Sequence, residues 1–265
     1  MSVDTGHLAM DRAALLARCH ENYVEVFRQL ARLGTGVVSD LGSTVFTVTR
    51  VPEVSLNPAF FVRVPPDAED AISAMRAFYL EQGPPWLVRL LPGVAAAMTP
   101  CLRTAGFREL GAQPGMLLDT LDSGAPAPPA GLEVRIVRDM PALLTYGDVL
   151  VEAFELTREM LRPIETPRLL DAPDMTLYLG YVDSRPVATA LRVSSHRIAG
   201  VFNIGTVPAY RGRGIGEAMT WIAALGGRDE GCVAAYLQAS EMGFPVYRRM
   251  GFLHVADYST WLPPA

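Results

Sequence analysis

Three glycines at alternate positions, Gly212, Gly214 and Gly216, stand between an apolar run that predicts a strand (199–207) and a pattern that predicts a helix (216–227). Glycine has no Cβ, so the main chain can approach a ligand closely at these positions. The start of a helix adds unpaired N–H groups and the positive end of the helix dipole. A strand, this loop and a helix in succession favour an α/β fold and an anion-binding loop over a plain surface turn.

Two familiar phosphate-binding loops do not fit this stretch. A dinucleotide-binding loop needs its third glycine one position later, where this chain has Glu217. An ATP-binding loop needs a lysine, and all 23 basic residues of the chain are arginine. The absence of lysine also excludes Schiff-base chemistry.

The glycine stretch and its flanks resemble the GNAT superfamily of N-acetyltransferases. The signature of that family is Gln or Arg, two residues, Gly, one residue, then Gly or Ala; residues 211–216 read RGRGIG. The preceding TVPAY and the later YRRMGF also look like the family's usual flanks. The resemblance runs from about Leu132 to the C-terminus. It implies that the anion is the pyrophosphate of coenzyme A, with acetyl-CoA as the acyl donor and no metal.

The resemblance also implies the site residues. Backbone groups near Gly205, Thr206 and Val207 would pair with the pantetheine arm as an extra strand does, and an amide near Val207 would polarise the thioester carbonyl. Tyr247 matches the family's usual proton donor to the leaving thiolate, although a packing role for this tyrosine stays open. The loop residues that would hold the pyrophosphate are Arg211, Gly212, Arg213, Gly214, Ile215 and Gly216.

The general base does not carry over from the family. Many relatives place Glu or His on the strand before the loop, where this chain has Gly200 and Phe202. Neither side chain can accept a proton, and deprotonation through ordered water stays open. Asn203 could hold such a water. Three other side chains could approach from neighbouring segments, but we expect them on the solvated surface: Glu152, Glu155 and His196.

The stretch SGAPAPPAG at residues 123–131 predicts a linker, because it contains no large apolar residue. It divides the chain into a domain at residues 1–122 and a domain at residues 132–265. We expect a mixed α/β (α+β) fold of two tandem GNAT-like domains, each with a central mixed sheet flanked by helices. In the first domain, one face of a long helix carries Leu15, Leu16, Cys19, Tyr23, Phe27 and Leu30.

The patterns predict an ordered series of further elements. In the first domain these are strands at 44–50 and 58–64, a helix at 67–83, a strand at 86–91, a helix at 94–107 and a strand at 115–119. The second has a strand at 132–139, a helix at 140–156, strands at 175–183, 186–195 and 199–207, a helix at 216–227 that stops at Gly226-Gly227, a strand at 232–240, a short helix at 245–252 and a last strand.

The matching order of elements, with CLRTAGF in the place of VYRRMGF, indicates a diverged internal duplication. In the first domain the loop is replaced by PPDAEDAISAM, whose prolines remove amides and whose acidic residues would repel a pyrophosphate. Leu102 stands where the second domain has Tyr247. The first domain is therefore predicted to be degenerate and to have a structural or acceptor-shaping role. This tandem arrangement resembles that of the mycothiol synthases in architecture alone.

Composition limits the remaining alternatives. A net charge of −5 argues against nucleic-acid binding, and no long apolar run or signal peptide is present, so we expect a cytoplasmic protein with no membrane partner. The scattered Cys and His residues predict no metal site. We expect an N-acetyltransferase that acts on the primary amine of a small molecule; a catalytically silent acyl-CoA sensor is the alternative. A homo-oligomer is compatible with the sequence, which does not identify the acceptor.

Overall fold

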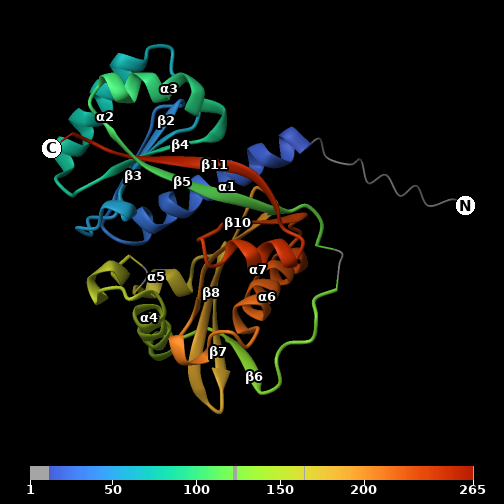
Figure 1. The fold of residues 1–265 in the computed structure, drawn as a ribbon. Helices are drawn as coiled ribbons and strands as arrows, with labels where there is room; N and C mark the ends of the chain where they lie inside the picture. The colour runs from blue at the N-terminus through green and yellow to red at the C-terminus, as the bar shows by residue number, and fades with distance from the viewer. Residues whose placement is uncertain (1–11, 122–123, 164, 265) are drawn as a thin grey trace, which may run out of the picture.

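The computed structural model describes residues 12–121, 124–163 and 165–264. Helices and strands alternate along the chain and build a mixed α/β fold (Figure 1). Residues 124–128 are exposed and lie outside helices and strands, as expected of a linker.

The N-terminal half contains the helices α1, α2 and α3, one short 3-10 helix and five strands. A parallel pair, β3 and β4, is joined by α2, which begins after Asp67 and ends at the left-handed Gly83 (φ 89°). The elements are α1 (Arg12–Leu33), β1 (Val37–Asp40), β2 (Thr44–Val48), η1 (Val54–Leu56), β3 (Pro58–Phe61), α2 (Ala68–Gln82), β4 (Leu87–Leu90), α3 (Pro92–Thr104) and β5 (Arg108–Leu118).

The C-terminal half repeats this order around a second parallel pair, β9 and β10, joined by α6. The expected turn between β7 and β8 is present, with positive φ at Asp183 and Ser184. The elements are β6 (Leu132–Ile136), α4 (Met140–Phe154), η2 (Arg158–Leu161), α5 (Pro167–Leu170), β7 (Met175–Val182), β8 (Arg185–Ser195), β9 (Ile198–Thr206), η3 (Pro208–Tyr210), α6 (Ile215–Asp229), β10 (Ala234–Gln238), α7 (Phe244–Arg249) and β11 (Leu253–Leu262).

All eleven described strands form one sheet, in the order β1-β2-β3-β4-β11-β5-β10-β9-β8-β7-β6. The last strand of each half is exchanged: β11 pairs with β4, and β5 pairs with β10. The two exchanged strands pair with each other in the middle, with Leu117 opposite Leu253 and Arg108 opposite Leu262. The mixed α/β class is thus confirmed. The two expected sheets form one continuous sheet, because the last strand of each half pairs with a strand of the other half.

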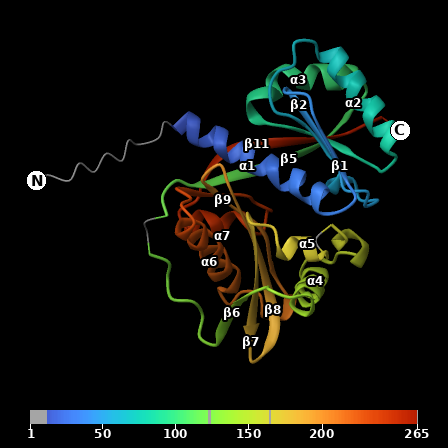
Figure 2. The same ribbon diagram turned by 180° about the vertical axis from the view of Figure 1, so that it is seen from behind.

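Helix α1 joins the two halves on one face of the sheet. It packs on β1 and β2 and also on β8 and β9, near α4 (Figure 2). Asn22 in this helix is fully buried, and its Nδ2 donates to Val193 O (2.9 Å), Ser195 Oγ (2.9 Å) and Ile198 O (3.2 Å). These bonds fix the N-terminal helix against the C-terminal strands.

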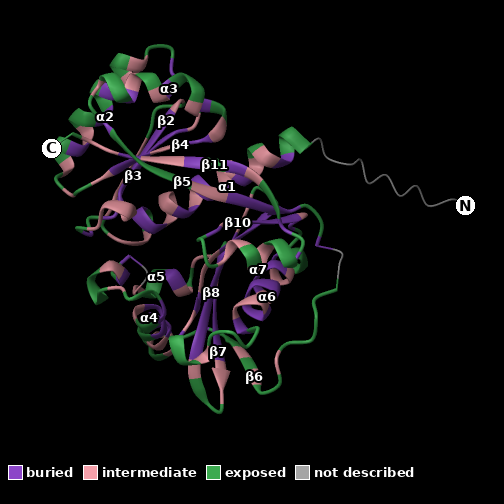
Figure 3. Ribbon diagram, viewed as in Figure 1, coloured by how far each residue is buried: buried purple, intermediate pink, exposed green. Residues whose placement is uncertain are grey.

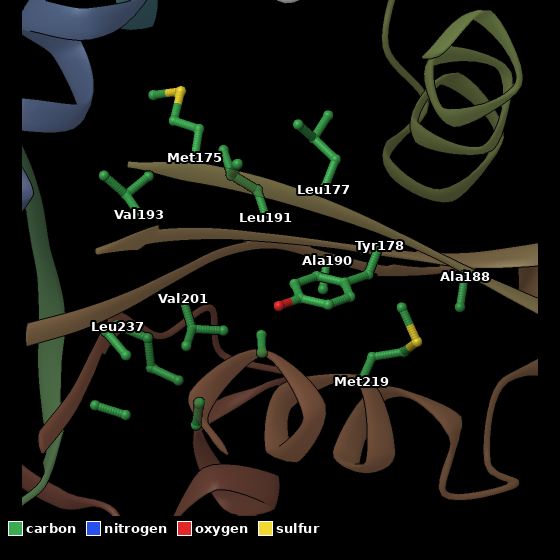
Figure 4. Close-up of a cluster of buried hydrophobic side chains, with 14 of the residues drawn as sticks. Met175, Leu177, Tyr178, Ala188, Ala190, Leu191, Val193, Val201, Met219 and Leu237 are labelled. Atoms are coloured by element: carbon green, nitrogen blue, oxygen red, sulfur yellow. The ribbon is translucent and has the colours of Figure 1, made fainter. Parts of the chain in front are cut away.

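The buried residues follow the sheet and the inner sides of its helices (Figure 3). In the C-terminal half, Leu177 and Leu191 point to one face of the sheet, whereas Tyr178 points to the face where Met219 of α6 lies (Figure 4). This alternation is the period-two pattern of a sheet covered on both sides. It holds β9 and α6, which carry the candidate site, in a rigid packed frame.

One expected helix end is wrong. Helix α6 does not stop at Gly226-Gly227 but continues to Asp229. A Cβ at Gly227 would approach the Cβ of Ala199 on β9 more closely than 3.0 Å, so this glycine lets helix and sheet approach. The sequence also did not predict β1. None of the described helices is both long and apolar enough to span a membrane.

Candidate active site

The glycine loop between η3 and α6 has the backbone that an anion site requires. Gly212 and Gly214 both have a φ of 75°, and Gly214 caps α6 without a side-chain hydrogen bond. The first bond of the helix runs from the N–H of Ala218 to the Gly214 carbonyl (3.0 Å). The N–H groups of residues 212–217 have no acceptor in the described part of the chain, so they are available to an anion.

The two arginines of the glycine loop hold it in place by hydrogen bonds to backbone carbonyls. Arg211 donates from Nε to Thr206 O (3.1 Å) and from Nη2 to Ala153 O (2.8 Å), which ties the loop to β9 and α4. Arg213 donates to Ala209 O (3.2 Å) and stacks on Tyr210, 4.9 Å from the ring centroid. Neither guanidinium has an acidic partner among the described residues, so their charge remains available to an anion.

The loop opens on a cavity of about 310 Å³, here called the loop cavity. Arg249 of α7 adds a positive charge to its wall, and Glu217 adds a negative one. Two residues expected to bind the cofactor, Val207 and Arg213, do not line the cavity. Those that do are Gly205, Thr206, Arg211, Gly212, Gly214, Ile215 and Gly216.

Strands β9 and β10 separate beside this cavity, because their pairing ends at Gly200 and Tyr236. The later residues of β9 therefore have one unpaired edge. The N–H of Val207, expected to polarise a carbonyl, instead donates to Val187 O (2.9 Å). Val207 is also fully buried. Neighbouring residues of a strand point their N–H groups to opposite sides, so the N–H of Thr206 faces the gap.

Tyr247 of α7 lines the loop cavity together with residues of the glycine loop. Its ring packs against Phe252, with centroids 5.9 Å apart, and closely against Gly243, where a Cβ would come within 2.8 Å of the ring. Burial raises the pKa of Tyr247 to about 12, and an interaction with Thr220 partly offsets this. The phenol therefore keeps its proton at neutral pH, as a proton donor must.

A second cavity of about 460 Å³, the junction cavity, lies between the halves. Helix α1, η1, β4 and β5 line it from the N-terminal half, and α4, η2, β8 and β9 line it from the C-terminal half. Phe154 lines both cavities, and β9 supplies Phe202 and Asn203 to one and Ile204 to the other. The two cavities therefore adjoin along β9.

The candidate general bases differ in whether they line one of the two cavities. Asn203 lines the junction cavity at a β-bulge, with a φ of 52° and its carbonyl bound by Thr189 Oγ1 (2.8 Å). Gly200 packs against Asn22, where a Cβ would collide, so α1 occupies the space of a side chain there. Three candidates lie outside both cavities: Glu152, which pairs with Arg185, Glu155 at the end of α4, and His196 in the β8–β9 turn.

No glycine loop of this kind precedes α2 in the described part of the N-terminal half. In the first turn of α2, the N–H of Asp70 donates to Asp67 Oδ1 (2.9 Å), so this amide is not available to a bound anion. Leu102, in the place of Tyr247, is fully buried in the core of that half.

Sequence reasoning missed Arg89 and Phe154. Arg89 is the only charged residue in the predicted strand at 86–91, and a charge inside an apolar strand is the signal that could have marked it. Phe154, at the end of α4, looked like one more apolar residue of an amphipathic helix. Its place between two cavities depends on the packing of α4 against β9.

Comparison with known proteins agrees with this geometry. Residues 146–252 match the family model described as the acetyltransferase (GNAT) family. No curated protein sequence matches the chain. Its fold is similar to a GCN5-related N-acetyltransferase from Kribbella flavida (20% identity, TM-score 0.71, covering 97% of each chain). It is also similar to one from Sphaerobacter thermophilus (19% identity, TM-score 0.61, covering 94% of this chain and 90% of that chain). Residues 146–252 are thus a domain of the acetyltransferase (GNAT) family.

Proposed function

We propose that the chain is an N-acetyltransferase that takes acetyl-CoA in the loop cavity and a small primary amine in the junction cavity. One observation carries the proposal: the glycine loop, whose amides at residues 212–217 are unpaired, and Tyr247 line the same cavity. An anion cradle and a proton donor in one cavity match the needs of a thioester whose carrier bears a diphosphate.

The side chains define how the reaction would proceed. Acetyl-CoA supplies a thioester, whose carbonyl carbon forms a bond to the amine nitrogen as the bond to sulfur breaks. The N–H of Thr206, facing the gap between β9 and β10, would stabilise the negative oxygen. Tyr247 would give its proton to the thiolate. The nitrogen would lose its proton to water held near Asn203, and solvent would return a proton to Tyr247.

A silent acyl-CoA sensor is the second candidate, favoured by one specific observation. Among the described residues that line the two cavities there is no histidine, and Glu217 is the only carboxylate. Glu217 lies in the first turn of α6, at the loop, so it is placed near the anion and not near the acceptor. A sensor would bind the same carrier without a base.

Acetyl-CoA turnover with a panel of primary amines separates the two candidates. We expect thiol release that depends on the amine. In Tyr247→Phe, kcat should fall by about 10²–10⁴ because a positioned proton donor is lost. Coenzyme A affinity should change less than about twofold, since the ring and its packing remain. Binding with no amine-dependent thiol release on the panel would favour the sensor, and an unchanged kcat in Tyr247→Phe would remove this residue from the mechanism.

A further inference from the structure

Arg89 places an unpaired positive charge in the junction cavity. It lies on β4, opposite Phe60 and Thr260 of the neighbouring strands. Its guanidinium carbon is 5.6 Å and 5.4 Å from the ring centroids of Tyr23 and Phe27. Burial lowers the pKa of Arg89 to about 10, so the group is still charged at neutral pH.

The partners of Arg89 are all neutral. Nη1 donates to the hydroxyl of Tyr23 and to Gln113 Oε1 (3.5 Å), and Nε is buried without an acceptor. No carboxylate lies within 4.0 Å of the guanidinium among the described residues. The described lining of the junction cavity contains no acidic side chain.

Two other enclosed arginines of this chain, Arg192 and Arg28, have acidic partners. Arg192, whose side chain is 4% exposed, pairs with Glu230. Arg28, which is 12% exposed, pairs with Asp40 at 2.7 Å. Burying a charge without a counter-ion is costly, and the fold avoids that cost at these two positions. Arg89 lacks such a partner, and it lines a cavity.

We propose that the acceptor carries a carboxylate as well as its amine, and that Arg89 binds this carboxylate in the junction cavity. This inference rests on the proposed function, since the amine must reach the end of the cavity that adjoins the loop cavity. Phe154 and Asn203 mark that end. Arg89 lines the same cavity from the opposite half of the chain.

The rest of the cavity wall defines the body of this acceptor. Apart from a few polar residues such as Arg89 and Asn203, the wall is mostly apolar and includes Leu56, Leu150 and Met160. A volume of about 460 Å³ lies in the usual range for small-molecule sites. The fitting class is an amino acid with an apolar body, its carboxylate held in the bidentate geometry that a guanidinium offers.

Product analogues test this without turnover. We would titrate the full chain with coenzyme A present, using N-acetyl-L-leucine and N-isopentylacetamide, which differ only by the carboxylate. We expect the acid to bind about tenfold or more tightly, because a charge-assisted hydrogen bond is gained. Equal binding of the two compounds would overturn the inference. If neither compound binds, the N-acetyl forms of other apolar amino acids are titrated in the same way, and no binding by any of them would also overturn it.

Two variants identify the residue. Arg89→Met keeps a flexible apolar stem but removes the guanidinium, and it should abolish the preference for the acid, whereas Arg108→Met, at an exposed position on β5, should keep it. A preference that survives in folded Arg89→Met contradicts the assignment. If Arg89→Met does not fold, the same comparison is made with Arg89→Lys, which keeps the charge but not the fork and should weaken the preference. Coenzyme A binding by the wild type, titrated alone, shows separately whether the proposed function holds.

Discussion

Replacing Gly227 by alanine tests how α6 is held against β9. A new Cβ would lie within 3.0 Å of the Ala199 Cβ and 3.4 Å from its Cα, whereas carbon atoms in contact sit about 3.5–4.0 Å apart. Ala199 is fully buried in a central strand, so it cannot retreat. Overpacking of this kind costs about 1–3 kcal/mol, and the gain in helix propensity returns at most about 1 kcal/mol. We expect a net destabilisation of about 1–2 kcal/mol.

Urea unfolding followed by circular dichroism measures this difference. Gly93→Ala is the matched control: it also lies in a helix, but its Cβ would meet nothing within 4 Å. That variant should be slightly more stable than the wild type, by up to about 1 kcal/mol. If Gly227→Ala were as stable as Gly93→Ala, the close approach of α6 to the sheet would not be what requires glycine there.

Three further predictions concern stability and charge. Burial lowers the pKa of His20 to about 4, so stability should fall as pH drops from 6.5 to 4. Urea unfolding in this range should show about 1–2 kcal/mol less of that loss in His20→Leu, and an equal loss in the variant would contradict the assignment. Asn22→Leu should cost about 2–4 kcal/mol in urea unfolding, because buried acceptors lose their donor, and a neutral result would contradict the bridging role of α1. Glu217→Gln should tighten coenzyme A binding about threefold at low salt, and this gain should shrink as salt rises; a weaker complex would mean that Glu217 does not face the anion.

Local patterns of apolar residues in the sequence predicted much of the fold. Strands β7 and β8 are mostly buried and apolar, and the tight turn at Asp183-Ser184 separates them, so their limits followed from the sequence. The early part of β5 did not, because residues 108–112 are exposed and show no alternation. The exchange of β5 and β11 is a pairing between distant segments, which no local periodicity encodes.

The candidate site was also predictable only in part from the sequence. The glycine loop and Tyr247 follow a motif whose backbone requirements are local, and both lie on the loop cavity. The bond from the N–H of Val207 to Val187 depends on the register of β8 and β9, so the expected role of that amide could not be checked from the sequence. The junction cavity needs both halves, so Arg89 and Phe154 acquire their place only after folding.

Calorimetric titration of the full chain with coenzyme A tests the central claim most directly. The account predicts one-to-one binding, weakened at least about tenfold in Gly214→Val, because a β-branched residue cannot hold a φ of 75° without strain. A wild-type chain that binds neither coenzyme A nor acetyl-CoA would contradict it.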